Sequence, residues 1–232
     1  VHLHSMQVMG QWVEDVPEYA IALAREFWPG PMTLILPRTK LAKDFITGGQ
    51  DTVGLRVPAH VTTLALLKEF HKLGGSGIAA PSANRFGAVS PTNADAVQSE
   101  LGESLDQSRD LIIDGGQSLV GVESTIIDCT DNFPKLLRPG FISLEMIIKT
   151  TELKATYNEN SKIRVSGSME KHYSPEAEIV LNGTVHAGDG FIALSNVRTP
   201  IGSFRLISPI SIEDFAHSLY QGLREADKKG IK

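Results

Sequence analysis

The sequence predicts a mixed α/β fold of the α+β type, in which a twisted mixed sheet with flanking helices is followed by a linker and a small second α/β unit. Short apolar segments with strand patterning recur between residues 32 and 140. Amphipathic helices lie between them without strict alternation, which disfavours a purely parallel sheet. A polar stretch over 151–175 then precedes a second group of strands. We therefore assign residues 1–150 and 176–232 to two domains and 151–175 to a linker.

Apolar spacing and turn residues predict each element of the first domain. Residues 17–28 have helical spacing with Pro17 in the first turn, and WPGP at 28–31 ends this helix. Thr92 and Asp95 form a capping box that opens the helix 93–101. Further helices are predicted at 60–73 and 143–149, and strands at 32–37, 51–57, 111–114, 122–129 and 135–140, with 78–80 as the end of another strand.

The second domain has the same kinds of signal in a shorter span. Strands are predicted at 178–183, 190–195 and 204–208, and Ser211 with Asp214 caps a helix that runs to about Lys229. Fewer than about 60 residues is small for an α/β domain. We expect this domain to continue past Lys232, and we expect residues upstream of Val1 because the chain begins in what looks like mid-strand.

Bulk composition disfavours several classes of protein. The net charge is −5 over 232 residues, so wholesale nucleic-acid binding is not indicated, although a cleft can gather a local basic patch. No segment approaches the ~18 apolar residues of a membrane span. The single cysteine, Cys129, lies in the apolar run STIIDC. It is interpreted as core filling in a reducing, cytoplasmic protein.

The loop 80–92, APSANRFGAVSPT, has the residue types of a ligand-binding loop. Ser82 and Asn84 lie two apart after a proline, so in an extended conformation both face one side. Their hydroxyl and amide groups suit a phosphate, carboxylate or ribose. Gly87 lets the backbone approach a ligand, and Thr92 supplies a hydroxyl at the positive end of a helix. An ordinary turn is the alternative for these residues taken alone.

Charged and polar residues within apolar strands form a second candidate group. Arg56 in GLRVP lies inside a strand, where a buried guanidinium needs an anion. Arg138 in LLRPG stands at a strand end. Two interpretations are open: its guanidinium binds a phosphate or carboxylate, or it is an exposed arginine without a partner. Glu123 and Ser124 in GVEST are either satisfied locally or face a cleft.

Histidines and common nucleotide motifs add little. His2 and His4 share one face of VHLH but have no third metal ligand. The sequence contains no GxxxxGK[ST], GxGxxG, HExxH or GxSxG motif. An enzyme that uses ATP would need a different phosphate-binding arrangement.

Six motifs, in order and spacing, resemble the YrdC-like family of threonylcarbamoyl-AMP synthases: FWPGPMTLIL, TVGLRVP, APSANRFGAVSPTN, IIDGG, GVESTIID and LLRPG. The KHYSP sequence at 171–175 and the extra unit, which is expected to be Rossmann-like, resemble the longer two-domain form, whose linker folds back over the active site. The resemblance implies that L-threonine, bicarbonate and ATP give L-threonylcarbamoyladenylate and pyrophosphate, usually with Mg²⁺. A separate tRNA threonylcarbamoyl transferase complex then modifies tRNA to t6A.

The resemblance also implies roles for particular residues. His2, Arg56, Ser82 and Ser124 are expected to hold threonine and its carbamate. Thr52, Asn84, Thr92, Arg138 and Tyr173 are expected to hold ATP. No residue is assigned as a covalent nucleophile or as a metal ligand. Binding of tRNA or double-stranded RNA is an expected property, since it is attributed to several members of the family.

Two segments of the family pattern, PTET-YGLG and K-x-R…NPL, should precede Val1. We therefore expect the 232-residue polypeptide alone to be poorly active, although the intact protein is an enzyme. One alternative is a YrdC-like RNA-binding or ribosome-maturation module without synthase activity, which the HYSP linker and second domain disfavour. Another is a carbamoyl-transfer enzyme related to hydrogenase-maturation proteins, which the lack of cysteine clusters disfavours.

Overall fold

The computed structural model describes residues 1–118, 120–158, 161–167 and 174–232. Contacts between Cα atoms divide the chain into two compact units. The first comprises Val1–Pro81 with Glu123–Ser168, and the second comprises Ser82–Val122 with Met169–Lys232. The segment that contains the loop 82–92 therefore groups with the C-terminal part of the chain.

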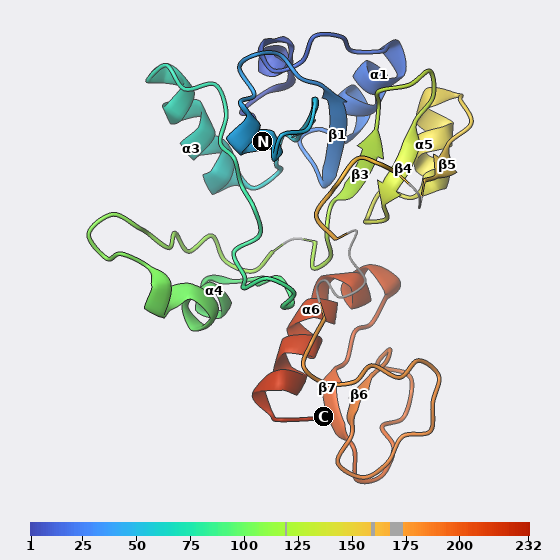
Figure 1. Ribbon diagram of the computed structural model, residues 1–232. Helices are drawn as coiled ribbons and strands as arrows, with labels where there is room; N and C mark the ends of the chain where they lie inside the picture. Colours follow the sequence, from blue (N-terminus) through green and yellow to red (C-terminus); the bar gives the residue numbers. More distant parts are fainter. Residues whose placement is uncertain (119, 159–160, 168–173) are drawn as a thin grey trace. The chain divides into compact units, whose positions relative to one another are not determined.

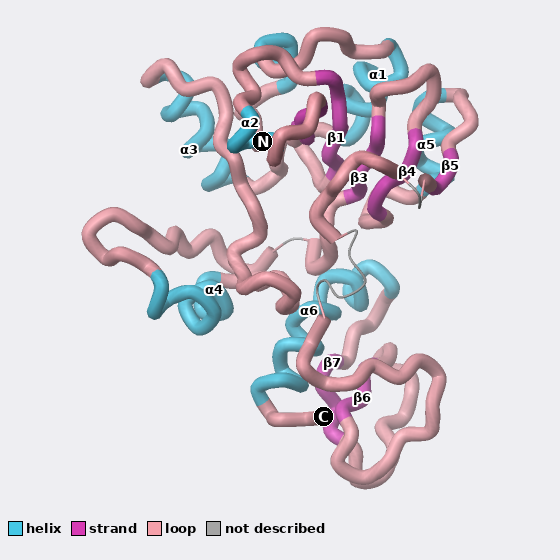
Figure 2. Tube along the Cα trace, viewed as in Figure 1, coloured by secondary structure: helices cyan, strands magenta, loops and turns pink. Residues whose placement is uncertain are grey.

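A mixed sheet is the centre of the first unit (Figures 1 and 2). Within the described residues it has five strands in the order β2-β1-β3-β4-β5. Strand β1 is antiparallel to β2 and parallel to β3, β3 is antiparallel to β4, and β4 is parallel to β5. The strands are β1 (Met32–Pro37), β2 (Thr52–Leu55), β3 (Thr125–Asp128), β4 (Lys135–Arg138) and β5 (Thr156–Tyr157). The predicted mixed sheet is confirmed.

Local signals define the helices of the first unit. Helix α1 (Glu18–Phe27) follows Pro17 and ends before WPGP, and α3 (Val61–Lys72) ends before Gly74. Helix α5 (Leu144–Thr151) begins after Ser143, whose hydroxyl accepts a hydrogen bond from the amide of Met146. These three predictions are confirmed to within one or two residues. The unit also contains η1 (Met6–Gln11) and α2 (Asp44–Thr47).

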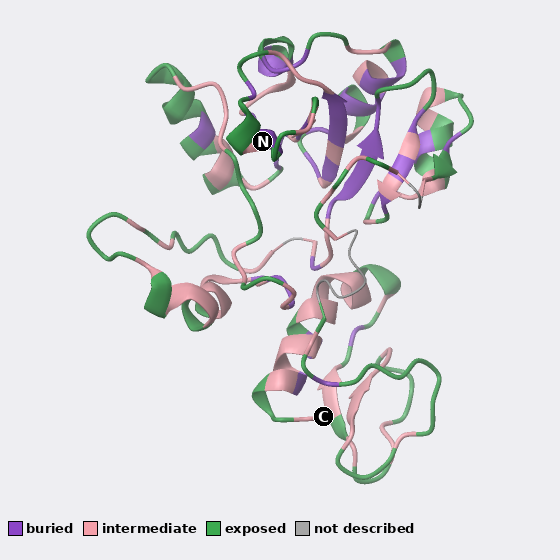
Figure 3. Cartoon of the chain, in the orientation of Figure 1, coloured by how far each residue is buried: buried purple, intermediate pink, exposed green. Residues whose placement is uncertain are grey.

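One face of this sheet is apolar, and the other carries most of its polar side chains together with Ile35 and Ile126. Successive side chains of a strand point to opposite faces. Leu34 of β1, Leu55 of β2 and Ile127 of β3 are fully buried and pack in one core with Leu23 of α1 and Ile147 of α5 (Figure 3). We call the second face the polar face after the polar residues at its alternate positions: Thr33, Thr52, Arg56, Ser124 and Arg138.

The second unit combines α4 (Ala94–Leu101) and η2 (Gly102–Ser104) with a C-terminal α/β part. In that part, strands β6 (Gly190–Ile192) and β7 (Phe204–Ile207) are parallel. Helix α6 (Ile212–Lys228) begins after Ser211, whose hydroxyl accepts a hydrogen bond from the amide of Asp214 at 3.1 Å. The predicted cap of this helix is confirmed.

Two predicted strands are wrong, and others are shorter than expected, such as β3 and β6. Residues 111–114 and 178–183 are not strands, and Leu111 and Leu181 are 85% and 84% exposed. An apolar run becomes a strand only where a partner strand and a core are available. Residues 78–80 contribute a single bridge, between Ile78 and His2.

Two further local predictions need correction. Helix α4 is capped by Asn93, whose side-chain oxygen accepts a hydrogen bond from the amide of Ala96 at 2.9 Å, and not by Thr92. The side-chain oxygen of Asn93 accepts from an amide of the first helical turn that has no partner within the helix, so Asn93 is the N-cap. The predicted linker begins as strand β5, which pairs with β4 through Thr156.

Gly140 allows the chain after β4 to pass close to β3. A Cβ at this position would lie 2.5 Å from the carbonyl oxygen of Glu123 and from the amide nitrogen of Thr125, both of which are backbone atoms. We expect Gly140→Ala to lower the free energy of unfolding by about 1–3 kcal/mol, measured by urea denaturation. Gly10→Ala is the control, because nothing lies within 4 Å of its added Cβ. Equal urea midpoints for the two variants would contradict this account.

Candidate active site

Arg138 is the most constrained residue of the polar face. It is 8% exposed. Its Nε and Nη2 atoms donate hydrogen bonds to the carbonyl oxygen of Ser124 at 3.0 and 2.8 Å, and Nη1 donates to the carbonyl oxygen of Ser166 at 3.0 Å. The guanidinium also forms an ion pair with Glu123 at 3.4 Å. Arg138 is therefore a buried, oriented cation and not an exposed surface arginine.

Ser124 connects β3 to both of its neighbouring strands. Its hydroxyl accepts a hydrogen bond from Nη2 of Arg138 at 2.9 Å and lies 3.1 Å from the hydroxyl of Thr33. The polar pair of GVEST is thus satisfied within the polar face. Thr33 was not among the predicted site residues. The signal that finds it is the strand register, since the parallel pairing of Thr33 with Ile126 places it on the same face as Ser124.

Arg56 and Arg138 act on each other electrostatically. Nε of Arg56 donates a hydrogen bond to the carbonyl oxygen of Gly30 at 2.9 Å. Burial lowers the pKa of Arg56; the carboxylate of Glu123 raises it and the positive charge of Arg138 lowers it. Two guanidinium groups thus share the field of one carboxylate. An anionic ligand that binds near them would offset the excess positive charge.

His2 lies beside Arg56 and forms bridges with Arg56 and Ile78. Burial and, to a smaller extent, the positive charge of Arg56 lower the pKa of His2 to about 3. The imidazole is consequently neutral near pH 7. A neutral imidazole offers one hydrogen-bond donor and one acceptor.

The depressed pKa of His2 predicts a loss of stability in acid. A group whose pKa is lower in the folded state contributes its full stability above the unfolded value of about 6.5 and loses it as the pH falls toward 3. We expect the free energy of unfolding to be lower at pH 5 than at pH 7.5, with His2 supplying up to about 2 kcal/mol of the difference. His2→Gln should reduce this pH dependence in urea titrations. An unchanged pH slope in His2→Gln would contradict the assignment.

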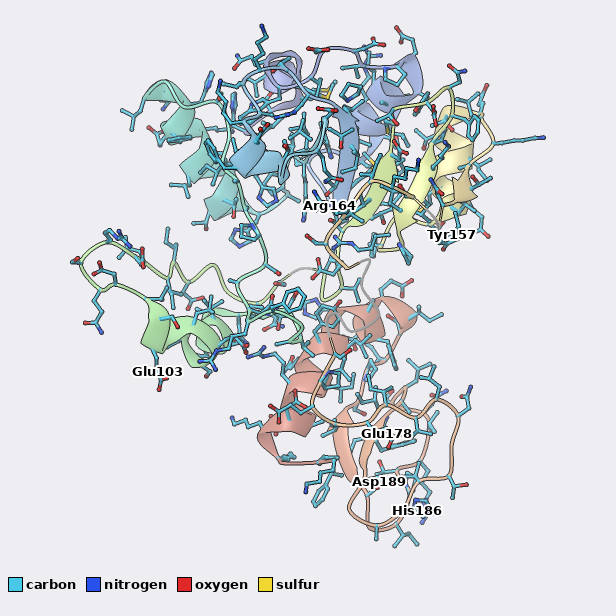
Figure 4. The ribbon with its side chains drawn as sticks, in the orientation of Figure 1. Glu103, Tyr157, Arg164, Glu178, His186 and Asp189 are labelled. Carbon is cyan, nitrogen blue, oxygen red and sulfur yellow. The ribbon has the colours of Figure 1, made fainter. Side chains whose placement is uncertain are left out.

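A segment of the predicted linker crosses the first unit near these residues. The amide and carbonyl of Arg164 form a reciprocal pair with the side chain of Gln50 at 2.7 and 3.0 Å, and Nη2 of Arg164 donates to the carbonyl oxygen of Gly48 at 2.7 Å (Figure 4). The contact from Arg138 to Ser166 holds the next residues. Residues 161–167 therefore extend from the 48–50 turn to Arg138. Tyr173, the expected ATP contact, lies outside the described residues.

The loop 82–92 belongs to the second unit and is closed by its own side chains. The amide nitrogen of the Asn84 side chain donates to the carbonyl oxygens of Arg85 and Ala88 at 2.8 and 3.1 Å. The Asn84 amide is therefore turned back into the loop, as Asx side chains in turns often are. Gly87 has a φ of 85°, in the left-handed region that glycine adopts readily. The hydroxyl of Thr92 is 2.9 Å from the Gln117 amide, which donates to it.

The predicted site residues are divided between the two units of the chain. His2, Arg56, Ser124 and Arg138 lie on or beside the polar face of the first unit. Thr52 lies at the other end of β2, where it pairs with Pro37, about 13 Å along the strand from Arg56 at 3.3 Å per residue. The loop residues Ser82, Asn84 and Thr92 belong to the second unit.

The remaining candidates show structural contacts. Cys129 is 1% exposed, and burial raises the pKa of its thiol, so its role as core filling is confirmed. The imidazole rings of His4 and His71 are stacked with their centroids 4.1 Å apart. Among the residues that the structure describes, no group of three His, Cys, Asp or Glu side chains could hold a metal ion. No helix in the described part is long and apolar enough to cross a membrane.

Comparison with known proteins places this site in a family. A family model for Sua5, YciO and YrdC proteins, described as telomere recombination, matches residues 1–140. The chain belongs to this family. A second model, the threonylcarbamoyl-AMP synthase C-terminal domain, matches residues 142–232, so the chain has the two-domain form. Both the family and the form agree with the resemblance inferred from the motifs.

Individual members of the family support the same grouping. The threonylcarbamoyl-AMP synthase of Pyrococcus abyssi is 40% identical, over all of this chain and 72% of its own length. That of Bacillus subtilis is 37% identical, over 78% of this chain and 51% of its own length. The crystal structure of P. abyssi Sua5 complexed with L-threonine superposes with a TM-score of 0.79 and 32% identity, covering 99% of this chain and 71% of that chain. The chain thus spans about half to three quarters of these relatives.

Proposed function

We propose that the protein is an L-threonylcarbamoyladenylate synthase, which forms threonylcarbamoyl-AMP and pyrophosphate from L-threonine, bicarbonate and ATP. The observation that carries this proposal is the pair of arginines, half-buried Arg56 and buried Arg138, which flank Glu123 and Ser124 on the polar face. The relatives named for this activity and the threonine complex of one family member support it.

Residue roles follow the family motifs. His2, Arg56, Ser82 and Ser124 are proposed to bind threonine and its carbamate. A guanidinium matches the carboxylate of threonine, and a neutral imidazole or hydroxyl can bond to its polar groups. Thr52, Asn84, Thr92, Arg138 and Tyr173 are proposed to bind ATP.

The reaction needs charge stabilisation and positioning more than a nucleophilic side chain. The threonine amine combines with bicarbonate to give a carbamate and water. A carbamate oxygen then forms a bond to the α-phosphorus of ATP, and the bond from that phosphorus to the pyrophosphate oxygen breaks. The carboxylate of threonine, the carbamate and the phosphates of ATP therefore meet at one centre. Preorganised guanidinium and hydroxyl groups stabilise such a gathering of negative charge.

A magnesium ion is implied by the family, and the donor set constrains how it would bind. Mg²⁺ at nucleotide sites is held mainly by phosphate oxygens and water, with one or two carboxylates. The carboxylate beside the two arginines, Glu123, is already paired with Arg138. The ion would therefore enter with the ATP phosphates, and its role would be to neutralise their charge.

The product defines the partners. Threonylcarbamoyl-AMP is a mixed anhydride that loses its acyl group readily. The proposed partner is a cytoplasmic tRNA threonylcarbamoyl transferase complex, which would transfer the threonylcarbamoyl group to an adenosine of tRNA with release of AMP, giving t6A. Direct binding of tRNA or double-stranded RNA would require a local basic surface, because the net charge of the chain is −5.

The test is pyrophosphate release by the full-length protein with ATP, threonine and bicarbonate. We expect release to require all three substrates and the nucleotide product to contain both threonine and a carbonyl group derived from bicarbonate. RNA binding without threonine-dependent release would favour an RNA-binding or ribosome-maturation module. Dependence on carbamoyl phosphate would favour a carbamoyl-transfer enzyme.

A further inference from the structure

Helix α6 of the C-terminal domain has two packing faces within the second unit. One face contacts the two-stranded sheet. A Cβ added to Gly222 would lie 3.1 Å from Ile207 and 3.3 Å from Ile192, and Ala226 is 4% exposed. Arg224 contacts a different part of the unit, the loop and helix that precede residue 102.

The guanidinium of Arg224 joins three points of the loop and helix. Nη1 donates to the carbonyl oxygen of Val89 at 2.8 Å, and Nη2 donates to the carbonyl oxygen of Ala96 at 3.3 Å and to the carboxylate of Glu100 at 3.1 Å. The other oxygen of Glu100 accepts a hydrogen bond from the amide of Arg85 at 3.1 Å. Arg224 and Glu100 together therefore hold both ends of the segment 85–89.

Other contacts attach the same region to α6. A Cβ on Gly121 would lie 1.9 Å from the carbonyl oxygen of His217, so the two backbones approach closely. The amide of Ser174 donates to the carbonyl oxygen of Gly87 at 3.1 Å, and Asp227 of α6 accepts from the amide of Glu176 at 2.8 Å. Ser174 thus joins the loop to a segment that Asp227 of α6 holds.

We propose that Arg224 is a positioning residue for ATP, which fixes the backbone between Asn84 and Thr92, the two loop residues proposed to bind the nucleotide. This inference rests on the proposed function. Asn84 is bonded to the carbonyl oxygen of Ala88, the neighbour of the Val89 that Arg224 holds. Without the guanidinium, ATP would have to order the loop as it binds, and that ordering lowers affinity. The C-terminal domain thereby contributes to the nucleotide site through one side chain.

The chemistry at this position favours arginine. A planar guanidinium can reach two carbonyl oxygens and a carboxylate at once, whereas the single ammonium of lysine cannot match the same geometry. The side chains of Arg224 and Glu100 are 20% and 15% exposed. We therefore expect a substitution to act on the order of the loop and on ATP binding more than on the turnover of bound substrate.

The experiment compares full-length wild-type protein with Arg224→Met, Arg224→Lys and the matched control Lys228→Met, an exposed position on the same helix. Steady-state pyrophosphate release gives kcat and the KM for ATP, and hydrogen exchange without ligands reports the order of residues 85–100. We expect Arg224→Met to raise the KM for ATP about tenfold with kcat within about twofold, and to speed exchange over 85–100. Arg224→Lys should show a smaller rise, and the control should match wild type.

Each outcome decides the proposal. An unchanged KM for ATP in an active, folded Arg224→Met protein overturns the proposal. A tenfold fall of kcat with unchanged hydrogen exchange over residues 85–100 also overturns it. If Arg224→Met does not fold, the KM for ATP of Arg224→Lys decides in the same way. If wild-type protein shows no threonine-dependent release, the proposed function fails. The affinity for ATP and the exchange rates of the same variants then test the role of Arg224 separately.

Discussion

Arg138→Met in the full-length protein should lower kcat/KM for ATP by about 10²–10³-fold, the loss that follows removal of a preorganised charge-stabilising donor. Arg138 is buried and donates to both the carbonyl oxygen and the hydroxyl of Ser124. Its loss would remove the ion pair with Glu123 and the hydrogen bonds to Ser124 and Ser166, so we also expect the free energy of unfolding to fall by about 3 kcal/mol. Pyrophosphate release and urea denaturation measure the two effects.

Two companion variants separate the catalytic effect of Arg138 from a general loss of folding. Arg138→Lys keeps the charge but cannot reproduce the forked contacts to Ser124, so kcat/KM should stay well below wild type while more stability is retained. Arg109→Met, at a side chain that is 75% exposed, should leave both quantities unchanged. Wild-type kcat/KM in a folded Arg138→Met protein would exclude Arg138 from the ATP site.

Arg56→Met should raise the KM for threonine by about 100-fold, with a smaller change in the KM for ATP. The guanidinium is anchored by its bond to the carbonyl oxygen of Gly30 and is the proposed partner of the threonine carboxylate. A charge-assisted, oriented contact of this kind contributes about 1.5–3 kcal/mol, which corresponds to roughly ten- to more than hundredfold in affinity. Initial rates at varied threonine and saturating ATP measure the effect.

The comparison of Arg56 with Arg138 tests whether each arginine binds a different substrate. Arg56→Lys should restore part of the threonine affinity, because a point charge still attracts a carboxylate. Arg25→Met, on the surface helix α1, is the matched control. If Arg56→Met and Arg138→Met raised the KM values for threonine and ATP to the same extents, the assignment of one arginine to each substrate would be wrong.

The helices and the family motifs were predictable because their signals are local. The caps at Ser143 and Ser211 and the stops at WPGP and Gly74 each depend on residues within one turn. The strands at 32–37 and 135–140 were recognisable from their apolar runs. The run at 111–114 has the same local appearance, yet its Leu111 is exposed, because a strand also needs a neighbour that no short segment can specify.

The candidate site was predictable in part for the same reason. An arginine in an apolar strand is visible in the sequence, so Arg56 and Arg138 were found. Thr33 was missed because its contact with the site depends on strand register, which places its hydroxyl 3.1 Å from that of Ser124. Arg224 was missed because its partners, Val89 and Glu100, are more than 120 residues away along the chain.

By itself the sequence determined which residues carry charge, where helices begin and end, and which six motifs identify the family. Only the tertiary structure decided which face of the sheet each polar residue occupies, which carboxylate meets Arg138, and that the loop 82–92 packs with α6. Helix caps and turns are short-range and are encoded within a few residues. Burial, ion pairing and strand register depend on chain segments that only folding brings within hydrogen-bonding distance.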